Sequence, residues 1–87
     1  MAYNGAMTVT VLLFASVAER AGTRKLQLPS SPGDSVAAVR DRLLERFPQL
    51  REYVPTLLYA LDETYVKESA LVEDGATLAL IPPVSGG

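Results

Sequence analysis

The stretch TVTVLLF at residues 8–14 decides the fold. It is rich in β-branched residues, and its side chains alternate between two faces of an extended chain, Val9, Val11 and Leu13 on one and Thr10, Leu12 and Phe14 on the other. We therefore predict a β-strand here. The second face is unusually apolar at Leu12 and Phe14, so either another layer covers it or it is an exposed contact surface.

The segments that follow predict a second strand and one helix. KLQL at 25–28 alternates again and stops at Pro29, which suggests a β-hairpin in which ASVAERAG at 15–22 is a wide connection. SSPGDS at 30–35 is dense in turn residues and offers Asp34 or Ser35 as a helix N-cap. Apolar residues then recur at spacings of three and four, which predicts an amphipathic helix that buries Val36, Val39, Leu43 and Phe47.

The rest of the chain reads as three more strands. Pro48 ends the helix, QLREY at 49–53 makes a further short turn, and LLYAL at 57–61 is extended. Asp62-Glu63-Thr64 predicts a tight turn into Tyr65-Val66, and Glu73-Asp74-Gly75 a turn into the last strand at 76–81, in which Leu78 and Leu80 share a face. One helix inside a run of five strands predicts an α+β fold, a β-grasp (ubiquitin-like) domain with a mixed sheet over residues 8–81. Residues 1–7 are expected to be a flexible extension.

Composition excludes most self-contained chemistry. The 87 residues carry 10 acidic and 8 basic side chains, for a net charge of −2, and contain no Cys, His or Trp. This removes thiol nucleophiles, disulfides and the commonest general base and metal ligand. The charge balance argues against binding to nucleic acid or anionic lipid, and the longest apolar run is far shorter than the ~20 residues that span a bilayer. We expect a cytoplasmic protein of one domain.

The tail PPVSGG at 82–87 is the most informative feature. Pro82 and Pro83 hold the chain extended and donate no ladder hydrogen bonds, so the tail should leave the sheet stiffly. Gly86 and Gly87 carry no side chain, which lets the tail pass through a narrow channel and present its α-carboxylate at the far end. A carboxylate is a poor electrophile, so chemistry there requires activation, for instance as an acyl-adenylate. The alternative is an inert, frayed end.

Other candidate residues give weaker signals. A basic contact patch or an ordinary solvated helix face explains Arg40, Arg42, Arg46 and Arg51, and the acidic residues among them favour the solvated face. Turn preference explains the possible cation ligands Asp62, Glu63, Glu73 and Asp74. Tyrosines 53, 59 and 65 are expected in the core or at an interface. The glycines fit neither a Rossmann fingerprint nor a P-loop, so no nucleotide site is expected.

The chain resembles the MoaD family, the ubiquitin-like sulfur carriers that form the small subunit of molybdopterin synthase. VLLFASVAERAGT at 11–23 and LVEDGATLALIPPVSGG at 71–87 carry the resemblance, and the closing PPVSGG is its most specific part. The likeness begins near Val9, which leaves MAYNGA at 1–6 outside it. The chain departs from the family at Asp62, because the strand after the helix usually carries an Asn near its turn.

The resemblance implies a function centred on Gly87. In the family, an adenylyltransferase resembling ubiquitin-activating enzymes uses ATP to adenylate the terminal carboxylate, which a sulfurtransferase-supplied sulfur converts to a thiocarboxylate. The thiocarboxylate donates sulfur to cyclic pyranopterin monophosphate in the active site of the large subunit, within a heterotetramer of two small and two large subunits. No cofactor or metal is expected on the carrier. The resemblance makes Gly86 the slim neighbour in the channel and places docking contacts at Phe14, Tyr65, Ile81, Pro82, Pro83 and Val84.

Three other functions stay open at this point. The carrier could serve thiamine synthesis or tRNA thiolation instead. A ubiquitin-like modifier would join Gly87 to lysines of target proteins. A plain interaction domain would leave the tail inert.

Overall fold

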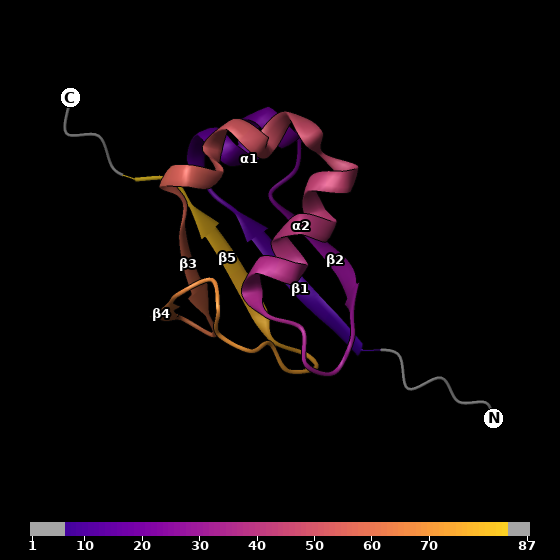
Figure 1. Ribbon diagram of the computed structural model, residues 1–87. Coiled ribbons are helices and arrows are strands. Elements are labelled where there is room, and N and C mark those ends of the chain that lie inside the picture. The colour runs from indigo at the N-terminus through magenta and orange to yellow at the C-terminus, as the bar shows by residue number, and fades with distance from the viewer. Residues whose placement is uncertain (1–6, 84–87) are drawn as a thin grey trace.

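One sheet of five strands, with helices packed on one of its faces, makes up the fold (Figure 1). The computed structural model describes residues 7–83. The elements, in chain order, are β1 (Met7–Leu13), α1 (Ala15–Ala21), β2 (Lys25–Ser30), α2 (Val36–Arg46), the 3₁₀ helix η1 (Pro48–Thr56), β3 (Leu58–Leu61), β4 (Thr64–Val66) and β5 (Thr77–Ile81).

The strand order β2-β1-β5-β3-β4 places the first and last strands side by side at the centre of the sheet. β1 and β5 are parallel, whereas β1–β2, β3–β5 and β3–β4 are antiparallel. A parallel pair requires a long crossover, and the chain through α2 and η1 provides it across one face of the sheet (Figure 1). This mixed sheet with a helix across it confirms the predicted α+β, β-grasp fold.

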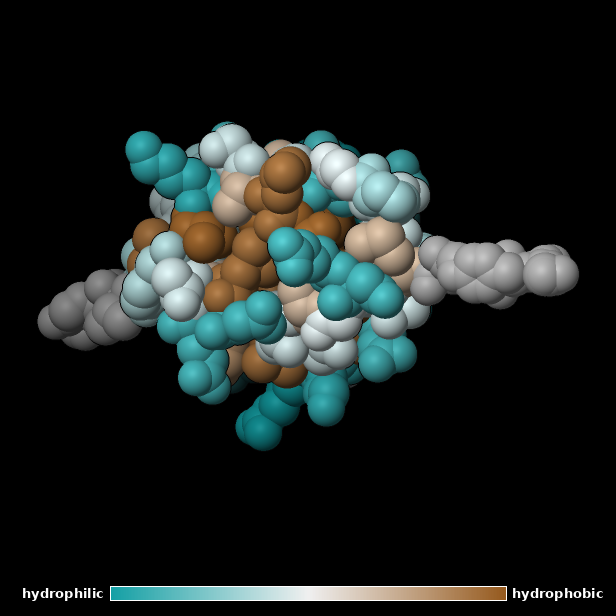
Figure 2. Space-filling model, turned by 90° about the horizontal axis from the view of Figure 1, so that it is seen from below, coloured by the Kyte–Doolittle hydropathy of each residue, from teal (hydrophilic) through white to brown (hydrophobic). Residues whose placement is uncertain are grey.

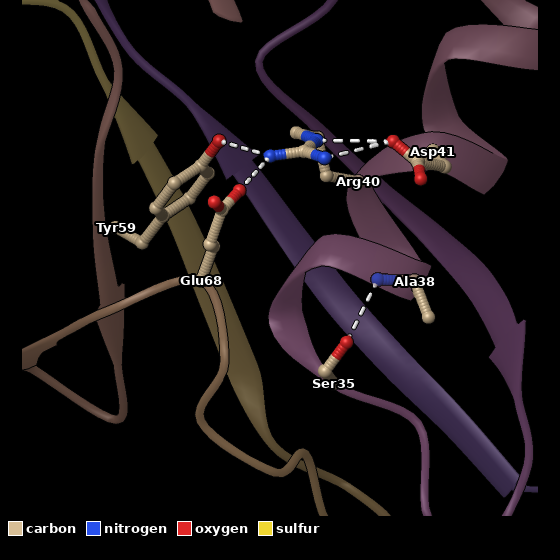
Figure 3. Close-up of polar contacts among 6 residues, drawn as sticks. All are labelled: Ser35, Ala38, Arg40, Asp41, Tyr59 and Glu68. Atoms are coloured by element: carbon tan, nitrogen blue, oxygen red, sulfur yellow. Dashed lines mark hydrogen bonds and ion pairs between the residues drawn. The ribbon is translucent and has the colours of Figure 1, made fainter. Parts of the chain in front are cut away.

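The core lies between the sheet and the helices. The predicted alternation in β1 is confirmed, because Val9, Val11 and Leu13 are buried while Phe14 is exposed. Val36, Val39 and Leu43 of α2 join the same cluster, as do Leu78 and Leu80 of β5. Phe47 was expected in the helix but is its C-cap, and it packs against the cluster only partly buried. Ser35 is the N-cap of α2, and its Oγ accepts a hydrogen bond from the backbone N–H of Ala38 at 3.1 Å (Figure 3).

The segment after β1 is not the open connection that the sequence suggested. It forms the two-turn helix α1, which buries Val17 in the core. The helix ends at Gly22, whose φ of 80° suits glycine and whose N–H donates to the carbonyl of Ala18 at 2.9 Å. Seven residues are too few to show a helical period, so the prediction missed this element.

Several predicted boundaries also shift. β2 continues through Pro29 to Ser30, which an edge strand permits because Pro29 has no N–H and no further strand lies on the outer side of β2 to need one. β1 begins at Met7, paired with Ser30, one residue earlier than expected. η1 is longer than the predicted turn and contains Pro55.

Candidate functional site

The face of the sheet opposite the helices is the candidate site. Buried residues of α1, α2 and η1 pack on the core face. Strand pairing defines one row that crosses the other face, because residues directly opposite each other in adjacent strands point the same way. This row contains Lys25 of β2, Leu12 of β1, Ala79 of β5, Ala60 of β3 and Tyr65 of β4. We call this surface the open face.

Apolar side chains dominate the open face. Phe14 is 44% exposed, Leu58 is 47% exposed and Tyr65 is 69% exposed. Leu58 pairs with Ile81, which is half-buried, in the row next to that of Leu12. A shallow hollow lies between Phe14, Tyr65 and Ile81, lined also by the small side chains of Ala60 and Ala79. Large apolar groups around a shallow hollow form a surface suited to contact with another macromolecule.

The backbone holds Phe14 firmly in this surface. Phe14 is the N-cap of α1, and its carbonyl accepts hydrogen bonds from Val17 at 3.0 Å and Ala18 at 3.3 Å. Ala15 follows with a φ of 50°, in the left-handed region that a residue with a Cβ rarely adopts. Strand β1 on one side and helix α1 on the other therefore fix the position of Phe14.

The β3–β4 turn forms an acidic corner of the open face. Asp62 and Glu63 have φ values of 47° and 73°, as a tight hairpin turn requires. Asp62 is tied to β5, because its N–H donates to the carbonyl of Thr77 and its Oδ1 accepts from the N–H of Thr77, both at 2.9 Å. An Asp at this position keeps the acceptor that an Asn would supply.

The tail begins beside the open face. Leu13 pairs with Leu80 in the parallel β1–β5 ladder. Phe14 and Ile81 are the next residues along these two strands, so they leave the ladder side by side. Pro82 is half-buried and Pro83 is exposed. The structure thus brings Phe14, Tyr65 and Ile81 together on one face, with Pro82 next in the chain. Val84, Gly86 and Gly87 lie outside the described residues.

Arg40 is not on a solvated face, so that expectation was wrong for this residue. Its side chain is only 12% exposed, and it bridges α2 to β3 and the loop after β4 (Figure 3). Its guanidinium donates to Tyr59 Oη at 3.1 Å, to Asp41 and to Glu68. Burial lowers the pKa of Arg40, but the hydrogen bonds to Tyr59, Glu68 and Asp41 outweigh it and raise the pKa overall. Arg40 is therefore part of the packing and unavailable as a contact patch.

The other arginines and tyrosines divide between packing and surface. Arg42 pairs with Asp34 at 3.0 Å, whereas Arg46 and Arg51 are exposed. A hydrogen bond from the N–H of Ser31 lowers the pKa of Asp34, and Arg42 adds to this shift against the opposing effect of burial. Tyr59 is buried and Tyr53 packs against the core, as expected, whereas Tyr65 is exposed, so its expected place at an interface stays a prediction.

Sequence reasoning did not single out two exposed leucines. Leu58 lies on the open face, and its alternation with Ala60 could have placed it there. Leu71 is 67% exposed in the loop after β4. Figure 2 views the end of the molecule to which this loop belongs, and a hydrophobic strip lies there among hydrophilic residues. No periodic pattern marks Leu71, so its exposure could not be predicted.

Two classes of site find no support in the part of the chain that the structure describes. Residues 7–83 contain no group of three or more acidic, His or Cys residues placed to hold a metal ion. Within the same residues, no helix is long and apolar enough to cross a membrane.

Comparison with known proteins identifies relatives along the whole chain. Residues 11–87 match the ThiS family. A molybdopterin synthase sulfur carrier subunit from Arabidopsis thaliana is 38% identical over 84 residues, which cover 97% of this chain and 88% of the relative.

Solved structures show the same fold. SAMP1, a small archaeal modifier protein from Haloferax volcanii, superimposes with a TM-score of 0.85 at 27% identity, over 92% of this chain and 99% of its own. A chain from the complex of subunits 1 and 2 of molybdopterin-converting factor from Helicobacter pylori has a TM-score of 0.68 at 22% identity, over 93% and 100%.

Proposed function

The chain belongs to the ThiS family, and on that premise we propose that it is the sulfur-carrier subunit of a molybdopterin synthase. The similarity to a sulfur carrier subunit of this enzyme, 38% identity over 97% of the chain, is the observation that carries the proposal. The family match runs through Gly86 and Gly87, the residues on which the proposed chemistry depends.

The proposed chemistry takes place on the α-carboxylate of Gly87. The carboxylate attacks ATP on an activating enzyme, so an acyl-adenylate forms and pyrophosphate leaves. A persulfide sulfur from a sulfurtransferase then attacks the acyl carbon and AMP leaves, and a thiol reduces the resulting acyl disulfide to a thiocarboxylate. The sulfur of this thiocarboxylate bonds to cyclic pyranopterin monophosphate, and water then cleaves the acyl–sulfur bond and restores the carboxylate of Gly87. We propose that this cycle takes place in the cytoplasm.

The carrier contributes the reactive carboxylate of Gly87 and a slim, stiff tail that presents it. Its sequence has no Cys or His, which removes the thiol nucleophile and the commonest general base, and we propose that catalysis falls to its partners and the chain is non-catalytic by itself. Gly86 keeps the end of the tail slim, and the stiff pair Pro82 and Pro83 aims it away from the sheet. ATP is used by the activating partner, and the carrier itself holds no cofactor.

The open face is the proposed docking surface for these partners. Phe14, Tyr65 and Ile81 form its apolar part, and Pro82, Pro83 and Val84 extend the contact along the tail. The partners are the large subunit, in a heterotetramer of two small and two large subunits, and the adenylyltransferase. The Helicobacter pylori structural neighbour belongs to a complex of two such subunits, which is consistent with a large-subunit partner.

A second candidate function is protein modification. SAMP1 is a small archaeal modifier protein by name, and this chain shares its fold at 27% identity. A modifier would use the same adenylate at Gly87, but a lysine amine of a target protein would take the place of sulfur. Sulfur transfer remains the leading proposal because the sequence similarity to the carrier subunit is higher.

Reconstitution with the large subunit, the activating enzyme, ATP and a sulfur donor tests the proposal. Deletion of Gly87 should abolish formation of the dithiolene product without loss of thermal stability, because the tail follows the last strand and the reactive carboxylate is displaced. Gly86→Val should fold equally well but fail in adenylation or transfer, because its branched side chain must enter the channel. Full product formation by the deletion variant would refute the carrier role, and isopeptide-linked adducts would favour the modifier.

A further inference from the structure

The open face carries charges of opposite sign at two diagonal corners. Lys25 lies on the edge strand β2 and pairs with Leu12, near the end of β1. Asp62 and Glu63 lie at the opposite edge, where the β3–β4 turn is bonded to Thr77 at the start of β5. Because β1 and β5 are parallel, these two corners are at opposite ends of the sheet as well as at opposite edges.

Both charged corners border the same apolar surface. The hollow that contains Asp62 and Glu63 is lined by Leu12 and Phe14. A second hollow is also lined by Leu12 and Phe14 and contains the basic residues Arg24 and Lys25 with one acidic residue, Glu19. The apolar strip thus runs from a basic corner to an acidic one.

Lys25 and Glu63, at these two corners, form no ion pair with other residues in the described part of the chain, 7–83. The ion pairs found among residues 7–83 join Arg20 to Glu52, Arg40 to Asp41 and Glu68, and Arg42 to Asp34. None of these pairs includes Lys25 or Glu63, and both side chains are exposed. The corners can therefore form ion pairs with another molecule.

We infer that the open face binds a second copy of this chain in a two-fold symmetric dimer. A two-fold axis along the other diagonal of the face lays the basic corner of each copy over the acidic corner of its partner. Phe14 lies on the basic half of the face, one strand from Lys25, so the same operation lays it over the acidic half of the partner, where Tyr65 lies, and its apolar surface leaves water. The face is thus complementary to itself in both charge and hydrophobicity, so a second copy of the chain is the partner that it fits.

Self-association on this face would compete with every partner that docks there. The dimer buries Phe14 and Tyr65, so the protein must dissociate before these residues contact anything else. Dimerisation would therefore shield the apolar surface when the chain is in excess. The inference does not depend on the sulfur-carrier role, because only the charges and exposed side chains of the open face enter it.

Sedimentation equilibrium of the full chain tests the dimer, at ~10 μM to ~1 mM to suit a small interface of weak affinity. The wild-type chain should pass from monomer to dimer over this range. Phe14→Ala should weaken the dimer about 30-fold, because the symmetry removes one large apolar side chain from each of the two copies. A wild-type chain that stays monomeric throughout the range overturns the inference.

Charge reversal tests the orientation of the two copies. Lys25→Glu and Glu63→Lys should each weaken the dimer about tenfold, because each creates like-charge contacts twice. An equimolar mixture of the two variants should dimerise again, because all corner contacts then have opposite signs. If the mixture stays as weak as its components, the proposed two-fold arrangement is wrong.

A matched control pair separates this effect from net charge. Arg51→Glu and Glu45→Lys make the same changes in charge at exposed positions of η1 and α2, away from the open face. Both variants should dimerise like the wild type. Equal weakening by the control pair would overturn the assignment to the open face, and unchanged melting temperatures in all variants confirm that folding is intact.

Discussion

The two faces of the sheet are built from neighbouring residues of the same strands, yet their environments are opposite. Leu13 is 2% exposed and Phe14, the next residue, is 44% exposed. Tyr59 is buried and Leu58 beside it is exposed. The difference arises because helices cover only one face, so equally apolar residues stabilise the fold on one side and remain available for binding on the other.

The covered face should show the largest loss of stability. Leu13→Ala should lower the free energy of unfolding by about 3–5 kcal/mol, because the truncated side chain leaves a cavity in a closed core. Urea denaturation of the purified variant measures this loss. A loss below about 1 kcal/mol would mean that the core face of β1 is not closely packed.

The open face should show a loss of binding instead. Phe14→Ala should weaken binding to the large subunit or the activating enzyme by ~2–4 kcal/mol, or roughly 30- to 1,000-fold, with little change in melting temperature. A titration beside a thermal melt measures both quantities. A large fall in melting temperature with unchanged affinity would show that Phe14 belongs to the core after all.

Arg40 extends the covered layer, so its replacement should resemble a core change of smaller size. Arg40→Met keeps most of the apolar stem but removes the donors to Tyr59 and Glu68, and should cost about 1–2 kcal/mol of stability. Arg46→Met on the same helix is the matched control, because Arg46 is exposed. Equal stability of the two variants would show that the Arg40 contacts contribute nothing.

Asp34 should give the smallest effect, confined to acid pH. Its pKa is lower in the folded state than in the unfolded chain, so the carboxylate stabilises the fold above the unfolded pKa. This stabilisation should disappear as the pH falls from about 4 through the lower folded pKa. Urea melts of Asp34→Asn at several pH values should show a shallower acid decline than the wild type, and an identical decline would contradict the assignment.

The sequence predicted the sheet because its signals are local and periodic. Alternation in β1 identified both faces, and the spacing of Val36, Val39 and Leu43 identified α2. The helix α1 was missed because it is two turns long, and its single buried residue, Val17, leaves no pattern. The burial of Arg40 also depends on tertiary contacts, because nothing in the helix sequence reveals that Tyr59 and Glu68 lie within its reach.

The site was predictable only as separate residues. The position of Phe14 follows from alternation, and the Asp62-Glu63 turn follows from turn preference. Their meeting on one face depends on the pairing of β1 with β5, which are more than 60 residues apart. The same long-range pairing sets the basic and acidic corners of the open face on one diagonal, which local sequence cannot reveal.

Mass spectrometry of the intact chain tests the central proposal, that Gly87 carries sulfur, most directly. The purified protein is incubated with its activating enzyme, ATP and a sulfur donor, and its mass is measured without reductive treatment. We expect a species about 16 Da heavier, because sulfur replaces one oxygen, with fragmentation placing the change at Gly87. If only the unmodified mass remains, or Gly87 is found joined to lysines of other proteins, the sulfur-carrier account is wrong.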